Sequence, residues 1–189
     1  MRKTLLLLML ASMALGACAP SPAPEPVTPV PQNPTASEFA LTSPVFTAAG
    51  PIPTKYGCTG QNISPPLTWS EPPVGTQALA LILYDPDAPG GDFVHWVIYQ
   101  MPATKRSLPE AIPTEASLED ASLQGQNGAA STGYIGPCPP SGTHHYVFTL
   151  YALDGGLDGL SAGLDRAQLL QAMQDHILAQ AELIGTFTR

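Results

Sequence analysis

Two polar clusters, well separated along this chain of 189 residues, hold the side chains that are best suited to chemistry. The first is Asp85-Pro86-Asp87-Ala88-Pro89, followed by His95-Trp96, and the second runs from Gly136 to Tyr146. Carboxylates accept hydrogen bonds, imidazoles donate or accept them, and a tyrosine hydroxyl does both. Each cluster stands at one end of an apolar run of strand type, so rigid elements should hold both. Together they predict the lining of a small polar pocket.

The spacing of these residues indicates which of them face the pocket. His144 and Tyr146 should share one face of a strand, because side chains alternate along it, whereas His145 should point the other way. A carboxylate such as Asp85, accepting from one ring nitrogen of His95, would orient that ring and raise its pKa. The other nitrogen could then donate to a phosphate-like ligand. An Asp-Pro turn that only ends a strand is the simpler alternative.

The same motifs resemble the phosphatidylethanolamine-binding protein family, above all its bacterial Raf-kinase-inhibitor-like (YbhB/YbcL) branch. Besides the DPDAP and HW segments and GPCPPSGTHHYVFTLYALD, the segment NISPPLTW from Asn62 to Trp69 is similar to a third family motif. The likeness runs from about Phe39 to the last residue, with the motifs in the family's order. It implies a pocket for a phosphate-bearing headgroup or a similar small anion. The matching positions here are Asp85, Asp87, His95, Pro137, His144 and Tyr146.

The second motif also departs from part of that family. Eukaryotic members often carry an arginine where this chain has His145, whereas Cys138 is usual in the bacterial branch. The missing positive charge weakens the case for phospholipid recognition and leaves small-anion binding intact. Backbone amides between Gly136 and Pro140 that are not proline could add donors. The resemblance to the bacterial branch further implies a homodimer.

Residues 1–17 predict a signal peptide of the lipoprotein type. The apolar stretch from Leu5 to Leu15 follows a short basic start and is too short to span a bilayer stably. Leu15-Gly16-Ala17-Cys18 resembles the lipobox of bacterial lipoproteins, in which cleavage before the cysteine leaves it to carry the lipid. A secretory signal cleaved near Ala17 or Ala19 and an uncleaved anchor are the alternatives. We therefore expect a lipid-anchored protein of the bacterial cell envelope, on the periplasmic or extracytoplasmic face of a membrane.

Residues 18–37 are rich in proline and nearly free of large apolar side chains. Such a segment buries too little surface to offset its ordering entropy, so it predicts a disordered tether. Residues 38–189 then form one domain. The formal net charge of −8 argues against nucleic-acid binding and against adsorption to anionic membranes. A phosphate-like ligand would need a local group of donors.

The cysteines allow one structural cross-link. If Cys18 carries the lipid, Cys58 and Cys138 remain as a pair in an oxidising compartment, where a disulfide persists. Such a bridge would fasten the Cys138 loop of the pocket to the Cys58 loop. Two unpaired thiols are the alternative, since bridging requires that the two Cα atoms lie close together.

The apolar patterns predict a mainly β protein: an antiparallel Greek-key sandwich, as the resemblance also implies, with a C-terminal α-helix. The region 108–124 is weakly patterned and is expected to be a loop with at most a short helix. The predicted helix runs from Leu164 to Leu183, starts with a capping box formed by Asp165 and Gln168, and ends at Gly185. The predicted strands are 39–46, 67–70, 77–84, 93–99 and 145–153.

These observations favour a non-catalytic binding protein for a small anion or phospho-headgroup, without a cofactor. Inhibition or regulation of an envelope protein such as a hydrolase is the alternative. An enzyme fits less well, because the chain lacks a GxSxG elbow, an HExxH helix and a glycine-rich phosphate loop. Acid–base catalysis, or a metal held by Asp85, Asp87, His95 and His144, would be the forms that an enzyme could take.

Overall fold

The structure is a computed structural model that describes residues 39–155 and 157–189. The predicted signal peptide, Cys18 and the proline-rich tether lie outside these residues. By its internal contacts the chain divides into Met1–Thr35 and Ala36–Arg189, and the fold described below belongs to the second unit. Within the described residues, no helix has the length and apolar character needed to cross a bilayer.

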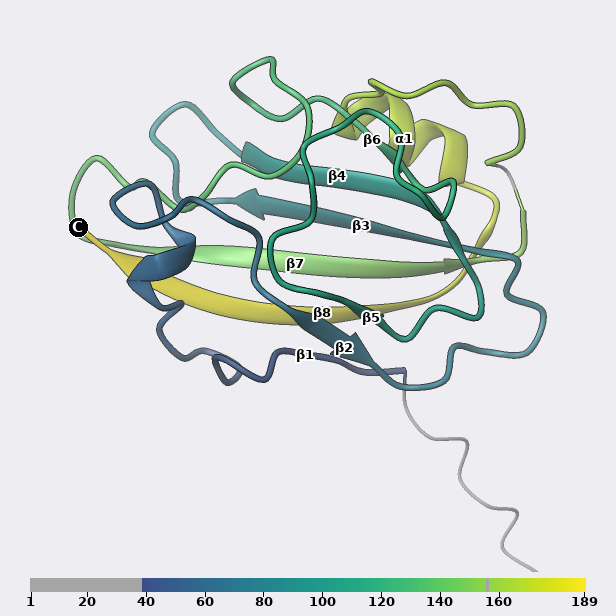
Figure 1. Cartoon of the computed structure of the whole chain (residues 1–189), viewed down its shortest axis with the longest axis horizontal. Helices are drawn as coiled ribbons and strands as arrows, with labels where there is room; N and C mark the ends of the chain where they lie inside the picture. Colours follow the sequence, from purple (N-terminus) through teal and green to yellow (C-terminus); the bar gives the residue numbers. More distant parts are fainter. Residues whose placement is uncertain (1–38, 156) are drawn as a thin grey trace, which may run out of the picture. The chain divides into compact units, whose positions relative to one another are not determined.

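Two antiparallel sheets form the unit (Figure 1). The larger has the strand order β6-β4-β3-β7-β8 and the smaller the order β1-β2-β5. The elements of the larger sheet are β3 (Ala78–Asp85), β4 (Phe93–Pro102), β6 (Leu123–Gln124), β7 (Thr143–Leu153) and β8 (Ile177–Thr188). The remaining elements are β1 (Leu41–Thr42), β2 (Leu67–Trp69), β5 (Ser107–Leu108), the 3-10 helix η1 (Thr54–Tyr56) and the helix α1 (Arg166–Met173).

Strand β3 lies at the centre of the larger sheet because both of its faces are apolar. Leu81 and Leu83 belong to the core that also contains Leu67 and Trp69 of the smaller sheet. Ile82, on the other face, belongs to a second core that includes side chains of α1. The continuous apolar run of this strand therefore reflects burial on both faces, as its sequence predicts.

The expected mainly β sandwich of antiparallel sheets is confirmed, and the four strands expected at 67–70, 77–84, 93–99 and 145–153 are present as β2, β3, β4 and β7. The strand expected at 39–46 is shorter: only Leu41–Thr42 pairs, as β1. The region 108–124 holds the end of β5 and the short strand β6, and no helix lies among these described residues.

The helix predicted from Leu164 to Leu183 is wrong over its second half. Helix α1 ends at Met173, and the chain then turns into β8, which pairs along the whole of β7. The predicted capping box is present: Gln168 N donates to Asp165 Oδ1 over 2.9 Å, and Asp165 N donates to Gln168 Oε1 over 3.0 Å.

The error arises because the segment after the helix satisfies two periodicities. Its apolar residues have helical spacing, but from Ala179 onward buried and exposed side chains also alternate. Pairing with the long β7 decides in favour of the strand, since a sheet neighbour satisfies every second backbone group. Gly185, predicted to end the helix, lies inside β8 and faces the core between the sheets.

The first half and the last residues of β8 lie beside different parts of the unit. Gln180 and Glu182 lie beside Phe39–Leu41, where the described chain begins. Phe187 pairs with His144, at the end of the sheet where the polar clusters meet. In Figure 1 the start of the described chain lies well away from the C-terminus, where β8 ends.

Gly185 offers a test of this register. A Cβ atom at this position would lie 2.6 Å from Ile52 Cγ1 and 3.0 Å from the Phe46 ring, so alanine overpacks the core. We expect Gly185→Ala to lower the free energy of unfolding by about 1–3 kcal/mol, measured by urea denaturation. Gly90→Ala is the control, because nothing lies within 4 Å of its Cβ, and it should change stability by less than about 0.5 kcal/mol. Equal effects of the two substitutions would contradict the packing of Gly185 against Ile52.

Candidate functional site

A cavity of about 210 Å³ lies at the end of the larger sheet where β3 ends and β7 begins. We call it the His–Asp pocket. Of the six residues predicted for the site, four line it, whereas Asp87 and Pro137 lie next to residues that do. Its lining residues are Asp85, Ala88, Pro89, Phe93, His95, Ile135, Gly136, Cys138, Pro140, His144 and Tyr146.

The buried pair of Asp85 and His144 joins the two polar clusters. His144 Nδ1 lies 2.7 Å from Asp85 Oδ2, and the side chains are only 10% and 5% exposed. A carboxylate oxygen accepts, so Nδ1 carries the proton and Nε2 of His144 is left for a ligand. The prediction that Asp85 would orient His95 is therefore wrong: the carboxylate orients His144.

His95 is positioned by an irregularity in β4. Leu83 of β3 pairs with Trp96 and Tyr84 pairs with Val94, which leaves His95 as the extra residue of a bulge. Bulges of this kind redirect a side chain, and here the imidazole turns into the pocket. The backbone N–H of Ile135 in turn donates to the carbonyl of His95 over 2.9 Å, which fastens the pocket loop to β4.

The chemistry of His95 differs from the sequence prediction. Its Nδ1 lies 2.7 Å from the carbonyl oxygen of Ile135, which can only accept, so Nδ1 carries the proton. Burial lowers the pKa of His95 below its ordinary value, although the Ile135 carbonyl and the charge of Asp85 partly oppose that shift. The expected rise in its pKa is wrong because desolvation outweighs the nearby carboxylate. His95 is therefore a neutral ring that offers Nε2 as an acceptor.

Tyr146 contributes a buried hydroxyl, with the Asp85 carboxylate and the Cys138 backbone nearby. The residue is fully buried, and its ring meets the His95 ring edge-on, with centroids 5.1 Å apart. Its hydroxyl makes no hydrogen bond of good geometry to the described residues. Burial, followed by the negative charge of Asp85, raises the pKa of Tyr146, so the hydroxyl keeps its proton. It can therefore donate to a ligand.

Asp87 and His145 form a second pair outside the pocket. Asp87 Oδ2 accepts the backbone N–H of His145 over 2.8 Å and lies 2.7 Å from His145 Nδ1. The backbone bond and then the side-chain bond lower the pKa of Asp87. Asp85 Oδ1 also accepts from the backbone N–H of Asp87 over 2.8 Å. His145 is exposed, as the two-residue strand period predicts, and Asp87 fixes the turn without lining the cavity.

The loop that carries Cys138 is fastened to the segment after η1. A disulfide joins Cys58 to Cys138, with Cα atoms 5.4 Å apart. The backbone N–H of Cys58 donates to the carbonyl of Pro137 over 3.0 Å, and Asn62 Oδ1 accepts from the N–H of Gly136 over 2.7 Å. Pro137 is buried in this wall, so its part is structural.

The sequence analysis missed the apolar walls of the pocket. Phe93 packs against His95 with ring centroids 5.0 Å apart. Ile135, in the loop before Gly136, also lines the pocket. Phe93 stands two residues before His95 in a predicted strand, and this spacing could have revealed it. Nothing in the sequence around Ile135 marks it as a lining residue, because its place follows from the fastened loop.

The histidines and carboxylates of the site do not gather around one point. Within residues 39–155 and 157–189, no group of three His, Cys, Asp or Glu side chains is placed to hold a metal ion. Asp85 faces His144, Asp87 faces His145, and His95 faces a carbonyl oxygen. These side chains are thus used in pairs, which does not support a four-ligand metal site.

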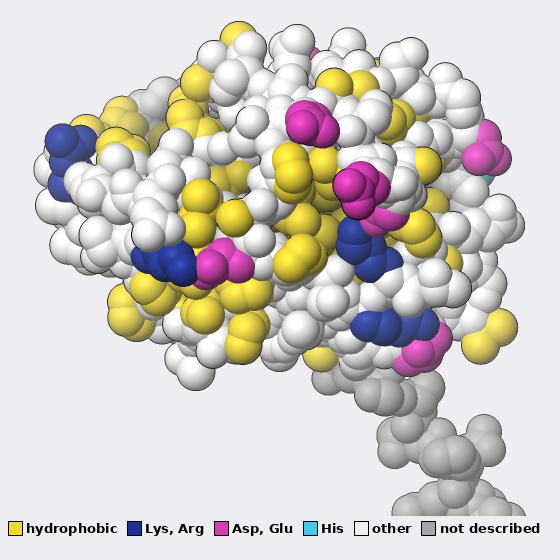
Figure 2. Space-filling view, in the orientation of Figure 1, with side chains coloured by type: hydrophobic (Ala, Val, Ile, Leu, Met, Phe, Trp, Pro, Cys, Tyr) yellow, Lys and Arg dark blue, Asp and Glu magenta, His cyan; other side chains and the backbone are white. Residues whose placement is uncertain are grey.

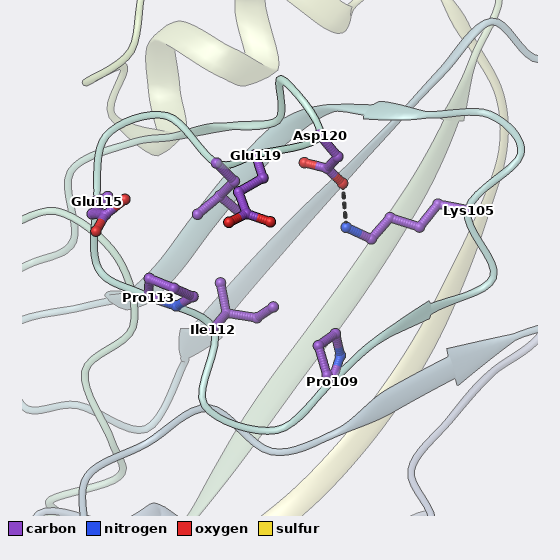
Figure 3. Close-up of a pocket in the computed structure, with 8 residues that line it drawn as sticks. Lys105, Pro109, Ile112, Pro113, Glu115, Glu119 and Asp120 are labelled. Carbon is purple, nitrogen blue, oxygen red and sulfur yellow. Dashed lines mark hydrogen bonds and ion pairs between the residues drawn. The ribbon is translucent and has the colours of Figure 1, made fainter.

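A larger cavity, of about 430 Å³, lies elsewhere on the surface (Figure 3). Its wall is formed by the loop between β5 and β6, and Figure 3 shows the ammonium of Lys105 turned toward the carboxylate of Asp120, 2.5 Å away. The Glu115 and Glu119 side chains are the other charged groups. None of its lining residues is a histidine or tyrosine, and the predicted site residues do not reach it.

Comparison with known proteins places this geometry in context. Residues 42–188 match a family model described as "Phosphatidylethanolamine-binding protein". A UPF0098 protein of Methanothermobacter thermautotrophicus is 47% identical over 149 residues, which cover 79% of this chain and 98% of the relative. LppC of Mycobacterium tuberculosis, whose name proposes a lipoprotein, is 40% identical over 185 residues, covering 90% of this chain and 77% of the relative.

Two solved structures are similar as well. One is a homologue of the same binding proteins from Chlamydia trachomatis, with a TM-score of 0.73 and 40% identity, covering 80% of this chain and 97% of the other. The second is Escherichia coli YbcL, with a TM-score of 0.72 and 32% identity, covering 81% of this chain and 99% of the other. YbcL is described as a new member of the mammalian family.

The neutral state of His95 predicts a pH dependence of stability. Because its pKa is lowered in the folded state, the unfolded chain takes up this proton first, and stability is lost as pH falls below the ordinary histidine pKa of 6.5. His95→Asn keeps a donor for Ile135 but removes the titration. Between pH 7.5 and pH 5, the parent should lose more unfolding free energy than the variant, by at most about 1.4 kcal/mol per pH unit. Urea denaturation measures this, and equal slopes would show that His95 is not held neutral.

Proposed function

Because the chain belongs to the phosphatidylethanolamine-binding protein family, we propose that its His–Asp pocket binds a small phosphate-bearing ligand without catalysing its conversion. The observation that carries this proposal is the buried hydroxyl of Tyr146, which lines the pocket and makes no hydrogen bond of good geometry to the described residues, although Asp85 and the Cys138 backbone lie near it. Buried polar groups are nearly always satisfied, so such a hydroxyl points to a ligand oxygen.

The other polar groups around Tyr146 fit a phosphate group that carries a proton. The backbone of Cys138 lies near the Tyr146 hydroxyl and lowers its pKa, as a nearby N–H donor does. His144 Nε2 is left free by the bond of Nδ1 to Asp85 and is a further contact point for the ligand. His95 Nε2 accepts, so it suits a protonated phosphate oxygen or an ammonium group. Phe93 and Ile135 exclude water, which strengthens each polar contact.

The described residues of the pocket wall offer no free serine, threonine or cysteine side chain, which supports a binding role. Two of the residues that form the wall carry a hydroxyl or a sulfur, Tyr146 and Cys138. The Cys138 sulfur is bonded to Cys58 in the disulfide, so it is not a free thiol. The pKa of Tyr146 is raised, which disfavours its anionic form. The Asp85–His144 pair therefore has no serine or cysteine to activate, in contrast to a catalytic triad.

We further propose that Cys18 carries a lipid and that residues 18–37 tether the domain to the bacterial cell envelope. The lipobox-like sequence and the likeness to LppC support this placement. The test is Cys18→Ser in the full chain. Intact mass should show the acyl groups on the parent and an unprocessed, unacylated variant, since the lipid requires the cysteine thiol. Membrane fractions should retain the parent after a salt wash, and acylation of the variant would contradict this assignment.

Tyr146→Phe tests the pocket with little risk to the fold, because the hydroxyl that it removes makes no hydrogen bond of good geometry to the residues that the structure describes. Calorimetry with inorganic phosphate and with phosphoethanolamine should show binding to the parent and about 5–10-fold weaker binding to the variant, as one hydrogen bond is lost. His144→Ala should remove binding altogether. His176→Ala is the matched control, since His176 pairs with Asp154 on the surface, and it should leave affinity unchanged.

The outcomes separate the possible functions. Binding that is lost in His144→Ala and weakened in Tyr146→Phe, with circular dichroism unchanged in the latter, supports the proposed pocket. A parent that binds neither phosphate compound would overturn the proposal and favour regulation of an envelope protein instead. Conversion of phosphoethanolamine during the titration, followed by phosphorus NMR, would overturn the non-catalytic part.

A further inference from the structure

An anion that enters the His–Asp pocket meets an unfavourable field. Asp85 places a buried carboxylate on the wall, and His95 is held neutral by burial. The described lining residues include no lysine or arginine, and the other histidine, His144, is already paired with that carboxylate. Phosphate binding in a chain of net charge −8 therefore needs a positive charge from just outside the lining.

Arg189 lies where such a charge is needed. Its backbone N–H donates to the Gly142 carbonyl over 3.1 Å, and its carbonyl accepts from the Gly142 N–H over 3.2 Å. This pairing extends the β7–β8 ladder by one residue and fixes the Arg189 Cα beside the start of β7. The Arg189 side chain reaches the Cys138 sulfur, with 3.6 Å between Nη1 and Sγ. Cys138 itself lines the pocket, so the guanidinium stands next to its wall.

The charge of Arg189 is also not committed to a carboxylate, unlike the other cations of the described residues. Lys55 pairs with Glu110, Lys105 with Asp120, Arg106 with Glu71, and Arg166 with Asp92. The side-chain partner of Arg189 is a disulfide sulfur, which is a weak acceptor. Figure 2 agrees: at the edge where Figure 1 marks the C-terminus, a basic group stands apart from acidic ones.

We propose that Arg189 is a ligand-binding residue of the His–Asp pocket. Its guanidinium supplies the positive charge that the phosphate group needs. This inference rests on the proposed function. A guanidinium presents a planar fork of donors that matches two phosphate oxygens, and an exposed side chain needs only rotation about its own bonds to leave the sulfur.

The test compares Arg189→Gln and Arg189→Lys with the parent chain. Calorimetry uses inorganic phosphate, phosphoethanolamine and a short-chain phosphatidylethanolamine below its micelle concentration. Arg189→Gln should bind phosphate about 5–10-fold more weakly than the parent, because it loses one charge-assisted contact. Arg189→Lys keeps most of that contact, so its affinity should stay within about threefold of the parent. The dependence of affinity on salt should become shallower in Arg189→Gln only. Arg106→Gln, which changes net charge equally but removes a cation paired with Glu71, should leave affinity unchanged.

Each outcome decides one question. Binding of phosphate by the parent that is unchanged in Arg189→Gln would overturn the inference and leave the proposed function standing. Equal losses in the glutamine and lysine variants, together with a lowered unfolding midpoint, would also overturn it and make Arg189 a structural clamp on the Cys138 loop. A parent that binds none of the three compounds is a failure of the proposed function. Binding of the lipid without binding of the two soluble compounds would identify a lipid headgroup as the source of the phosphate.

Discussion

The site depends on the buried carboxylate of Asp85 at the end of the central strand. Oδ2 holds the His144 ring and Oδ1 holds the backbone of Asp87, so one side chain connects β3, β7 and the turn between β3 and β4. A carboxylate this deeply buried is tolerated only when both oxygens are engaged. Loss of either partner would leave charge uncompensated in an apolar surrounding, where breaking a buried pair costs about 3–5 kcal/mol. Asp85 is thus as much a structural element as a part of the pocket.

The pocket is built at a place where the sheet departs from regularity. In a regular strand the side chains of His95 and Trp96 would point to opposite faces of the sheet. Because of the bulge both point to the same side, Trp96 into the core and His95 into the cavity. The fastened loop from Gly136 to Cys138 then closes the other side. Gly136 is required there because a Cβ atom would lie 2.3 Å from the carbonyl oxygen of Tyr56. Rigid backbone on both sides thus fixes the polar groups of the pocket, and a site fixed in this way loses less entropy on binding than a mobile one.

Much of this architecture could be predicted from local sequence pattern. The alternation in β7 assigns His144 and Tyr146 to one face and His145 to the other, and the apolar run of β3 marks the centre of the sheet. The pairing of charges within the site could not be predicted. Whether Asp85 hydrogen-bonds to His144 or to His95 depends on the register between three strands and on one bulge. Neither feature can be predicted from a local sequence pattern.

The C-terminal segment was predicted wrongly for a related reason. The helical spacing of apolar residues continues past the end of α1 to Ala181, where the strand alternation of β8 has already begun, and pairing with the long partner β7 decides for the strand. Asp87 shows the same limit at a single residue: the family motif identifies it, but its carboxylate turns outward to His145 and away from the cavity. Tertiary pairing therefore decided what the motifs left open.

The separation between the start of the described chain and the pocket has a mechanical consequence. Phe39 to Leu41 lie beside Gln180 and Glu182, about 20 Å along β8 from Phe187 at the rate of rise of an extended strand. Tension applied through the preceding residues would first load the two-residue pairing of β1 with β2 in the smaller sheet. The strands that carry Asp85 and His144 belong to the larger sheet and are paired along nearly their whole length. Such a load would therefore separate β1 from β2 and leave the end of the larger sheet that holds the His–Asp pocket undistorted.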